Sequence, residues 1–170
     1  MDLRYSEEYE EFREEVRAFL AENWPPKGAE AELGPSERVA SFRKRAIERG
    51  YLARALPRKY GGSEQTPDVL RAVSIQEEFG RVGAPQDIGV PGAQLLPTLL
   101  AHGTEQQKLR YLPPSILGEL VWCQGYSEPG SGSDLASIQT RAELVGDEWV
   151  INGQKIWTSG AQQADMIYLL

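Results

Sequence analysis

The sequence has very few of the residues that bind metals or form disulfides. Its 170 residues include one cysteine, Cys123, and one histidine, His102. A single cysteine excludes an internal disulfide, and these two residues do not make up the ligand set of a zinc site. We therefore expect no metal centre. Cys123 is interpreted as a small buried hydrophobe on a β-like segment, and His102 as the end of a helix.

Long apolar runs are also missing. No segment approaches the roughly 18 uninterrupted apolar residues that a membrane helix needs. The chain starts with MDLRYSEEYEEFREE, which is polar and acidic and unlike the basic and apolar layout of a secretion signal. These features predict a soluble, cytoplasmic protein with no membrane partner.

An excess of positive charge is absent as well. The formal net charge is −7, and the 18 lysines and arginines are scattered along the chain instead of forming a basic stripe. Such a chain repels a phosphate backbone, so we expect no nucleic-acid partner. A small phosphorylated cofactor stays compatible with this charge, because local backbone amides and helix dipoles hold such ligands.

The first two thirds of the sequence shows helical periodicity. Apolar residues recur at helical spacing in five segments, which are bounded by Ser, Thr, Pro or Gly signals. The expected helices begin after Ser6 and end at Pro25, and then run from Ser36 to Gly50, from Pro67 to Gly80, over residues 92–102, and from Thr104 to Leu112.

Two of these helices carry specific signals at their ends. Thr66 followed by Pro67 is expected to cap the third helix, whose core-facing residues are expected to be Val69, Leu70, Val73 and Phe79. In the last helix Thr104 and Gln107 form a capping-box pattern, and the dipeptide Pro113-Pro114 is expected to stop it.

From about residue 120 the periodicity changes from helical to twofold. The segments 120–126, 137–145, 148–151, 154–159 and 165–170 are rich in β-branched and aromatic residues. We expect these segments to form an antiparallel meander. The dipeptide Asn152-Gly153 predicts a two-residue hairpin turn, because both central positions of such a turn have positive φ.

The order of elements predicts an α+β chain with two domains. An N-terminal all-α domain is expected over residues 1–118, followed over 119–170 by the first part of an antiparallel β domain of the sandwich or barrel kind. The sequence stops at MIYLL, an apolar strand-like segment, and unpaired apolar edges are rare in natural proteins. We therefore expect a fragment of a longer protein, or a partner chain that covers this edge.

The stretch SEPGSGSD has the composition of an anion-binding loop. Gly130 and Gly132 permit backbone conformations in which successive amides converge, with the hydroxyls of Ser131 and Ser133 beside them. The same composition also suits a plain surface loop that joins two domains. Ser127 is interpreted either as a hydrogen-bond donor to a ligand at the strand end or as a strand terminator.

A second candidate region is KIWTSG. Trp157 offers a flat face, and Thr158 and Ser159 offer hydroxyls and amides, which together suit a wall for a planar heteroaromatic ring. Taken alone, Trp157 also fits a place in the core. Glu128 and Asp134 are interpreted as structural residues of a tight turn and of a loop, and not as an acid–base pair.

Read jointly, these segments resemble the acyl-CoA dehydrogenase family. YSEPGSGSDLASIQT and, further along, VINGQKIWTSGAQQADMIYLL are similar to the flavin-binding signature of that family. ALPRKYGG, SIQEEFGRVGAP and LLAHGTEQQKLRYLPPSILGE also resemble the corresponding segments, so the likeness spans nearly the whole chain. It implies a helical domain followed by a β domain that contacts FAD.

The resemblance implies a flavin-ring site at the end of the first strand. By position, Gln124, Tyr126 and Ser127 would contact the edge of the isoalloxazine. Gly132 and Ser133 match residues at the FAD pyrophosphate, and the Ser133 position also lies close to the acyl-CoA.

On the second segment, the resemblance places Trp157, Thr158 and Ser159 against the flavin, with Ser159 near the nitrogen that accepts the hydride. The sequence reads WTSG where many relatives read WITN. We expect FAD binding to survive this difference, because Ser159 keeps the hydroxyl, but the substrate subgroup stays open.

The activity implied by the resemblance is α,β-dehydrogenation of an acyl-CoA thioester in fatty-acid or other lipid metabolism. A glutamate base removes the α proton while the β hydrogen leaves as a hydride to the flavin. That base is expected beyond Leu170, so no residue is assigned as catalytic and this piece alone is expected to be inactive. The implied partners are the acyl-CoA, an electron-transferring flavoprotein, and further copies in a homotetramer or homodimer.

Two other functions remain open at this point. One is a flavin-dependent oxidase or monooxygenase of the same superfamily. The other is a non-catalytic subunit of a heteromeric acyl-CoA dehydrogenase.

Overall fold

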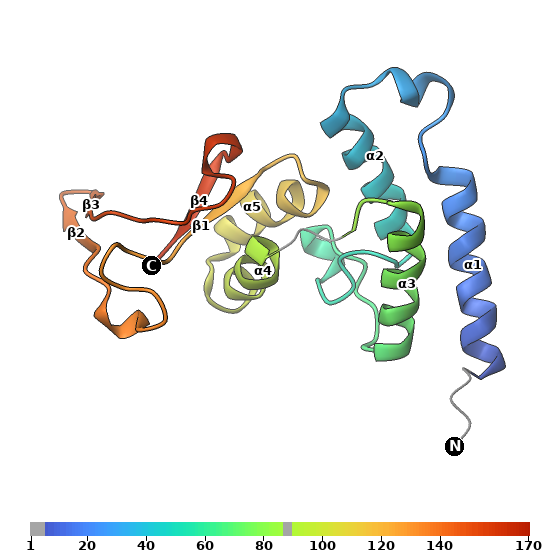
Figure 1. Cartoon of the computed structure of the whole chain (residues 1–170), viewed down its shortest axis with the longest axis horizontal. Coiled ribbons are helices and arrows are strands. Elements are labelled where there is room, and N and C mark those ends of the chain that lie inside the picture. Colours follow the sequence, from blue (N-terminus) through green and yellow to red (C-terminus); the bar gives the residue numbers. More distant parts are fainter. Residues whose placement is uncertain (1–5, 87–89) are drawn as a thin grey trace. The chain divides into compact units, whose positions relative to one another are not determined.

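Helices form the first unit of the structure, and short strands form the second (Figure 1). The computed structural model describes residues 6–86 and 90–170. The first unit ends at Glu119, and the second spans Leu120–Leu170. The helices are α1 (Glu7–Asn23), α2 (Pro35–Glu48), α3 (Val69–Val82), α4 (Val90–His102) and α5 (Glu105–Leu117), and the strands are β1 (Trp122–Gly125), β2 (Arg141–Val145), β3 (Glu148–Asn152) and β4 (Met166–Leu169).

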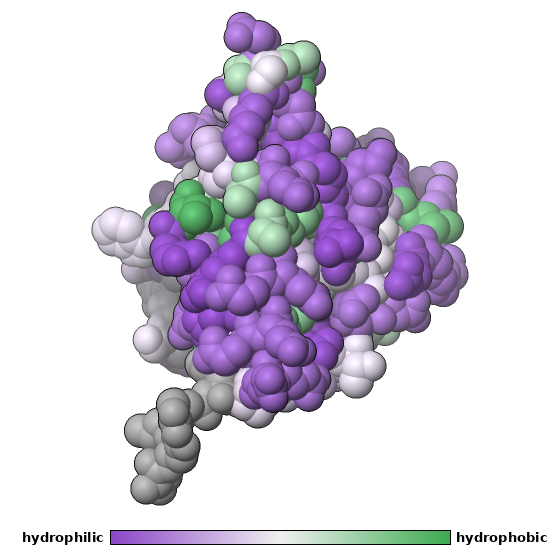
Figure 2. Space-filling model, turned by 90° about the vertical axis from the view of Figure 1, so that its right-hand side faces the viewer, coloured by the Kyte–Doolittle hydropathy of each residue, from purple (hydrophilic) through white to green (hydrophobic). Residues whose placement is uncertain are grey.

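The first helix, α1, forms as its sequence pattern predicts. Glu7, Glu8 and Glu10 lie in its first turn, where negative charge interacts favourably with the helix dipole. Its buried side chains belong to one stripe that includes Val16 and Phe19. Seen from the α1 side, the surface is mostly hydrophilic with a few small apolar patches (Figure 2).

Aromatic rings form the centre of the first unit. Phe42 of α2 and Phe79 of α3 are fully buried, with ring centroids 5.7 Å apart. Phe19 of α1 contacts both Phe42 and Tyr51, at centroid distances of 5.9 and 5.1 Å. Edge-to-face and tilted pairs of this kind add to the hydrophobic stabilisation of a core. Three helices and the loop after α2 are therefore joined through one aromatic cluster.

The start of α3 differs from the prediction. Asp68 is the N-cap, and its Oδ1 accepts a hydrogen bond from the amide of Arg71 at 3.0 Å. Thr66 and Pro67 precede the helix, so the expected cap was wrong by two residues. Val69 and Leu70 are exposed, because the buried stripe of α3 starts one turn later, at Ser74 and Ile75.

The predicted capping box of α5 is confirmed, but its predicted end is wrong. Thr104 Oγ1 accepts from the Gln107 amide at 3.2 Å, and Gln107 Oε1 accepts from the Thr104 amide at 2.8 Å. The helix continues through Pro113 and Pro114 to Leu117. The fixed φ of proline is compatible with a helix, although neither proline has an N–H group to donate a helical hydrogen bond. Gly118, with φ +81°, ends it.

The second unit contains two pairs of strands. The expected fold class, a helical domain followed by the start of a β domain, is confirmed. β2 and β3 pair antiparallel, as expected, but β1 and β4 pair in parallel, with Gln124 opposite Tyr168. The strands are therefore not joined as a simple meander. Residues 154–159, expected as a strand, have irregular backbone.

The hairpin turn lies elsewhere than predicted. Val145 of β2 pairs with Glu148 of β3, so the two-residue turn consists of Gly146 and Asp147, and Gly146 has φ +64°. Asn152 is the last residue of β3, and neither it nor Gly153 has a positive φ. Within the described ranges, none of the helices is long and apolar enough to span a membrane.

The buried aromatic cluster makes a testable difference to stability. Replacing Phe42, which is fully buried, by alanine is expected to lower the free energy of unfolding by about 3–5 kcal/mol, because it leaves a cavity among rings. The control is Val69→Ala, at a side chain that is 76% exposed, with an expected change within about 0.5 kcal/mol. Urea unfolding followed by circular dichroism measures both, and similar losses in the two variants would contradict the described core.

Candidate functional site

The site begins at the end of β1. Gln124 is a half-buried residue of this strand, and Tyr126 and Ser127 follow directly after it. The Tyr126 ring lies 5.6 Å from the ring of Tyr168 on the neighbouring strand β4. Burial, followed by the hydrogen bond with Tyr168, raises the pKa of Tyr126 to about 12, so this phenol is neutral at physiological pH.

A tight turn follows, built by the residues SEPGS. The amide of Glu128 donates to the carbonyl of Ser131 at 2.7 Å, and the amide of Ser131 donates back to the carbonyl of Glu128 at 3.1 Å. The buried hydroxyl of Ser131 donates to the backbone carbonyl of Asp134 at 2.6 Å. Glu128 thus has the structural place expected for it, and Asp134 contributes through its backbone carbonyl.

Gly132 and Ser133 lie on the exposed side of this loop. Among the described residues, the backbone amides of Gly132 and Ser133 have no hydrogen-bond partner in the chain. A Cβ placed on Gly132 would meet no atom within 4 Å. Both residues are exposed, so two neighbouring unpaired amides and the Ser133 hydroxyl are available to a ligand.

The segment that carries Trp157 runs beside the end of β1. The amide of Ile156 donates to the carbonyl of Ser127 at 2.9 Å, which joins the two predicted halves of the site. Trp157 has a φ of +57° and is 85% exposed, so it is not part of the core. The amide of Ser159 donates to the carbonyl of Trp157 at 2.9 Å, across the half-buried Thr158. A left-handed residue in this position breaks the extended backbone that the sequence pattern predicted.

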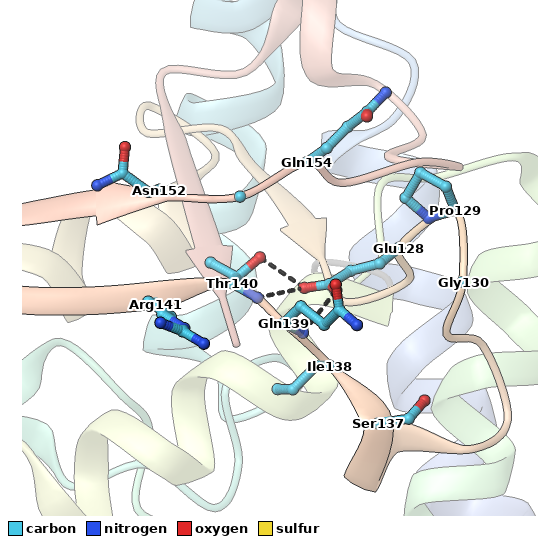
Figure 3. Close-up of a pocket in the computed structure, with 11 residues that line it drawn as sticks. Glu128, Pro129, Gly130, Ser137, Ile138, Gln139, Thr140, Arg141, Asn152 and Gln154 are labelled. Atoms are coloured by element: carbon cyan, nitrogen blue, oxygen red, sulfur yellow. Dashed lines mark hydrogen bonds between the residues drawn. The ribbon is translucent and has the colours of Figure 1, made fainter.

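The carboxylate of Glu128 joins three segments of the second unit. It is 7% exposed and accepts hydrogen bonds from the Gln139 amide at 2.7 Å, from the Thr140 amide at 2.9 Å and from the Thr140 hydroxyl at 2.6 Å (Figure 3). Lys155 Nζ donates to the same carboxylate at 2.8 Å and to the carbonyl of Tyr126 at 3.0 Å. Lys155 and Thr140 were not among the predicted site residues.

These bonds keep Glu128 ionised. The hydrogen bond from Lys155, followed by those from Thr140 and Gln139, lowers the pKa of Glu128 from 4.5 to about 2, although burial acts in the opposite direction. A carboxylate with four donors and this pKa is a poor general base near neutral pH. The place of Glu128 before Pro129 indicates a turn residue. Nothing in the sequence predicts its ion pair with Lys155, which is 27 residues away.

Gly153 supports the same cluster. A Cβ on Gly153 would lie 2.2 Å from Thr140 Oγ1, so only glycine permits this close approach. The glycine that predicted a hairpin turn is therefore needed for packing against Thr140. Glu128, Thr140 and Gly153 belong to the lining of a pocket of about 880 Å³ that also includes Arg141 and Asn152 (Figure 3).

The chain is similar to known proteins over both of its units. A sequence description of the acyl-CoA dehydrogenase N-terminal domain matches residues 6–119, and one of the acyl-CoA dehydrogenase middle domain matches residues 123–170. The chain belongs to the acyl-CoA dehydrogenase family. Among its relatives is the acyl-CoA dehydrogenase IpdE1 of Mycobacterium tuberculosis, which is 42% identical over 173 residues, or 96% of this chain and 44% of that protein.

Solved structures of acyl-CoA dehydrogenases are similar as well. The ChsE4–ChsE5 complex from Mycobacterium tuberculosis contains a chain that is 35% identical with a TM-score of 0.72, covering 99% of this chain and 43% of that one. An acyl-CoA dehydrogenase complexed with FAD from Bacillus anthracis is 30% identical with a TM-score of 0.60, covering 97% and 28%. The chain thus spans less than half the length of these relatives.

The close approach of Gly153 to Thr140 gives one prediction for this acyl-CoA dehydrogenase chain. Gly153→Ala is expected to displace Thr140 and to lower the free energy of unfolding by about 1–3 kcal/mol, as overpacking does. Gly130→Ala, where a Cβ would meet nothing within 4 Å, is the matched control and is expected to change it by about 0.5 kcal/mol or less. Chemical unfolding measures both, and an equally stable Gly153→Ala variant would contradict the described packing.

The lowered pKa of Glu128 gives a second prediction. Because the folded pKa is about 2 and the ordinary value is 4.5, the stabilisation is present above pH 4.5 and is lost as the pH falls towards 2. Glu128→Gln is expected to remove this part of the pH dependence, whereas Glu143→Gln on exposed β2 keeps it. The measurement is the difference in unfolding free energy between each variant and the wild type at several pH values. A constant difference for Glu128→Gln would show that the carboxylate is not stabilised by folding.

Proposed function

We propose that this chain is the N-terminal part of a cytoplasmic, oligomeric, FAD-dependent enzyme that dehydrogenates an acyl-CoA thioester between its α and β carbons. In this proposal residues 1–118 are the helical domain, and residues 119–170 are the first part of the FAD-contacting middle domain. The observation that carries it is the hydrogen-bonded junction of the Ser127 carbonyl with the Ile156 amide, at 2.9 Å. It joins the two segments that resemble the family's flavin-binding signature.

The donors in this region suit FAD. Gly132 and Ser133 are exposed and their amides are not bonded within the described chain, as an anion such as a pyrophosphate requires, and Gly132 leaves room for close approach. Trp157 presents an exposed aromatic face for a planar ring. The relative from Bacillus anthracis, which is complexed with FAD, supports the same cofactor.

In the proposed complex each predicted residue contacts a particular part of the cofactor or the substrate. Gln124, Tyr126 and Ser127 contact the edge of the isoalloxazine. Gly132 and Ser133 hold the pyrophosphate, and Ser133 also lies beside the acyl-CoA.

On the second segment, Trp157, Thr158 and Ser159 would contact the flavin ring. The neutral phenol of Tyr126 brings no charge to the ring. When bound, FAD accepts the hydride that leaves the β carbon.

We assign proton abstraction to no residue of this chain. Glu128 is unsuited, because four hydrogen bonds occupy its oxygens and a pKa of about 2 makes it a weak base. In the family this base is a glutamate of the C-terminal helical domain. An electron-transferring flavoprotein is the proposed acceptor of the electrons.

A heteromeric assembly is the second candidate for how this chain works. Its support is the ChsE4–ChsE5 complex, in which a similar chain is assembled with a second, different one. Here the chain would complete an acyl-CoA dehydrogenase whose other subunit is a relative. Copurification of a homologous chain from the native source favours this candidate over the homotetramer or homodimer.

A flavin titration tests the proposed cofactor. Protein purified from its complete reading frame is expected to carry or take up FAD, seen as a visible absorption spectrum. Trp157→Ala is expected to weaken FAD binding about tenfold, because an aromatic contact with the ring is lost. Trp149→Ala, at an exposed tryptophan of β3, is the matched control and is expected to bind FAD like the wild type.

Two results would oppose the proposal. Wild-type protein that neither carries nor takes up FAD would end it. Equal losses of FAD affinity in Trp157→Ala and Trp149→Ala would show that Trp157 does not contact the flavin, while FAD would still be the proposed cofactor.

A further inference from the structure

The two members of the Glu128–Lys155 ion pair adjoin, along the chain, the residues that we propose to face the flavin. Both side chains are nearly buried, with 7% and 8% exposed, and they are 2.8 Å apart. Glu128 follows Tyr126 and Ser127 in the sequence, and Lys155 precedes Ile156 and Trp157. Each charged residue is therefore joined by one or two peptide units to a proposed ring contact.

The contacts of the pair fix the spacing between these two segments. Lys155 Nζ bridges the carbonyl of Tyr126 at 3.0 Å and the carboxylate of Glu128 at 2.8 Å. Alongside it, the Ile156 amide donates to the Ser127 carbonyl at 2.9 Å. Three bonds thus connect three successive positions of one segment, Tyr126 to Glu128, with two of the other, Lys155 and Ile156. A shift of either segment would break at least one of these bonds.

The carboxylate also connects this junction to the start of β2. The amides of Gln139 and Thr140 and the Thr140 hydroxyl all donate to Glu128 (Figure 3). With these donors in place the carboxylate has little freedom to rotate, and Lys155 is held at one position. A buried charge with several directed partners specifies geometry more strictly than apolar packing does.

Stabilisation of the fold does not by itself explain why a buried ion pair is present here. Removing two charges from water is costly, and buried ion pairs are often replaceable by apolar residues with no loss of stability. What an apolar pair cannot reproduce is the directed bond from Lys155 Nζ to the Tyr126 carbonyl. The contribution expected from Lys155 is therefore mainly the orientation of the backbone.

We propose that Glu128 and Lys155 are positioning residues of the flavin pocket, which hold the Tyr126–Ser127 and Ile156–Ser159 segments as one rigid wall for the isoalloxazine. This rests on the proposed function. Neither side chain is required to touch the cofactor, since both act through the backbone that carries the contacting residues.

The test uses protein from the complete reading frame in four forms. Lys155→Met removes the ammonium and keeps most of the stem. The double variant Glu128→Gln with Lys155→Met removes both charges, so that no unpaired charge stays buried. Lys59→Met is the matched control, since Lys59 forms an ion pair with Glu105 at 3.4 Å in which both side chains are more than half exposed. For each form we measure the thermal midpoint without FAD, the FAD dissociation constant, and the reduction potential and visible spectrum with FAD bound.

The expected results separate positioning from stability. Lys155→Met lowers the thermal midpoint and weakens FAD binding about tenfold or more. The double variant recovers the midpoint, but its FAD affinity stays reduced and its spectrum and reduction potential stay shifted. Lys59→Met is expected to have the thermal midpoint, FAD affinity, spectrum and reduction potential of the wild type. A double variant with wild-type stability, affinity, spectrum and potential would overturn the proposal, while wild-type protein without FAD uptake would instead overturn the proposed function.

A measurement on the wild type keeps the proposal testable should the variants not fold. Amide hydrogen exchange is recorded with and without FAD for peptides that cover residues 124–134 and 154–163. A single rigid wall predicts that FAD slows exchange in both peptides together. Protection of one peptide without the other would contradict it.

Discussion

The carboxylate of Glu128 is the point on which the second unit depends. It is buried and ionised, so each of its oxygens needs partners, and four donors from two other segments supply them. A buried carboxylate that lost these donors would be strongly unfavourable. The turn after β1, the start of β2 and the segment after β3 therefore come together in one arrangement.

This arrangement joins two short motifs that lie apart in the sequence. SEPGSGSD supplies the carboxylate and the open amides, and KIWTSG supplies the lysine and the exposed tryptophan. Neither motif forms a site alone, because the first is a surface loop and the second has irregular backbone. The hydrogen bond from the Ile156 amide to the Ser127 carbonyl joins the two. Membership of the acyl-CoA dehydrogenase family gives this joined surface a function in our proposal, namely to hold one side of FAD.

The first unit is organised by a different kind of interaction. Its aromatic cluster packs the helices α1, α2 and α3 around Phe42, and a buried carboxylate, Glu78 of α3, accepts bonds from Arg13 and Arg17 of α1 at 3.2 and 2.8 Å. These arginines lower the pKa of Glu78, with the hydrogen bond from Arg17 as the largest cause. Apolar burial thus supplies the stability here, and the ion pairs align α1 with α3.

The sequence by itself determined the features that depend on neighbouring residues. The order of helices before strands, the capping box of Thr104 and the place of Glu128 in a turn follow from local patterns of hydrogen bonding and periodicity. The family resemblance also came from the sequence, and it named the candidate flavin residues, whose roles remain predictions.

Only the tertiary structure decided the features that depend on distant partners. Pro113 and Pro114 stay inside α5, Gly153 serves close packing against Thr140 instead of a turn, and Lys155 turns inward to Glu128. A proline, a glycine or a lysine has the same local preferences wherever it stands. Which of its possible roles it takes depends on the atoms that the fold brings within contact distance, and those atoms belong to residues far away in the sequence.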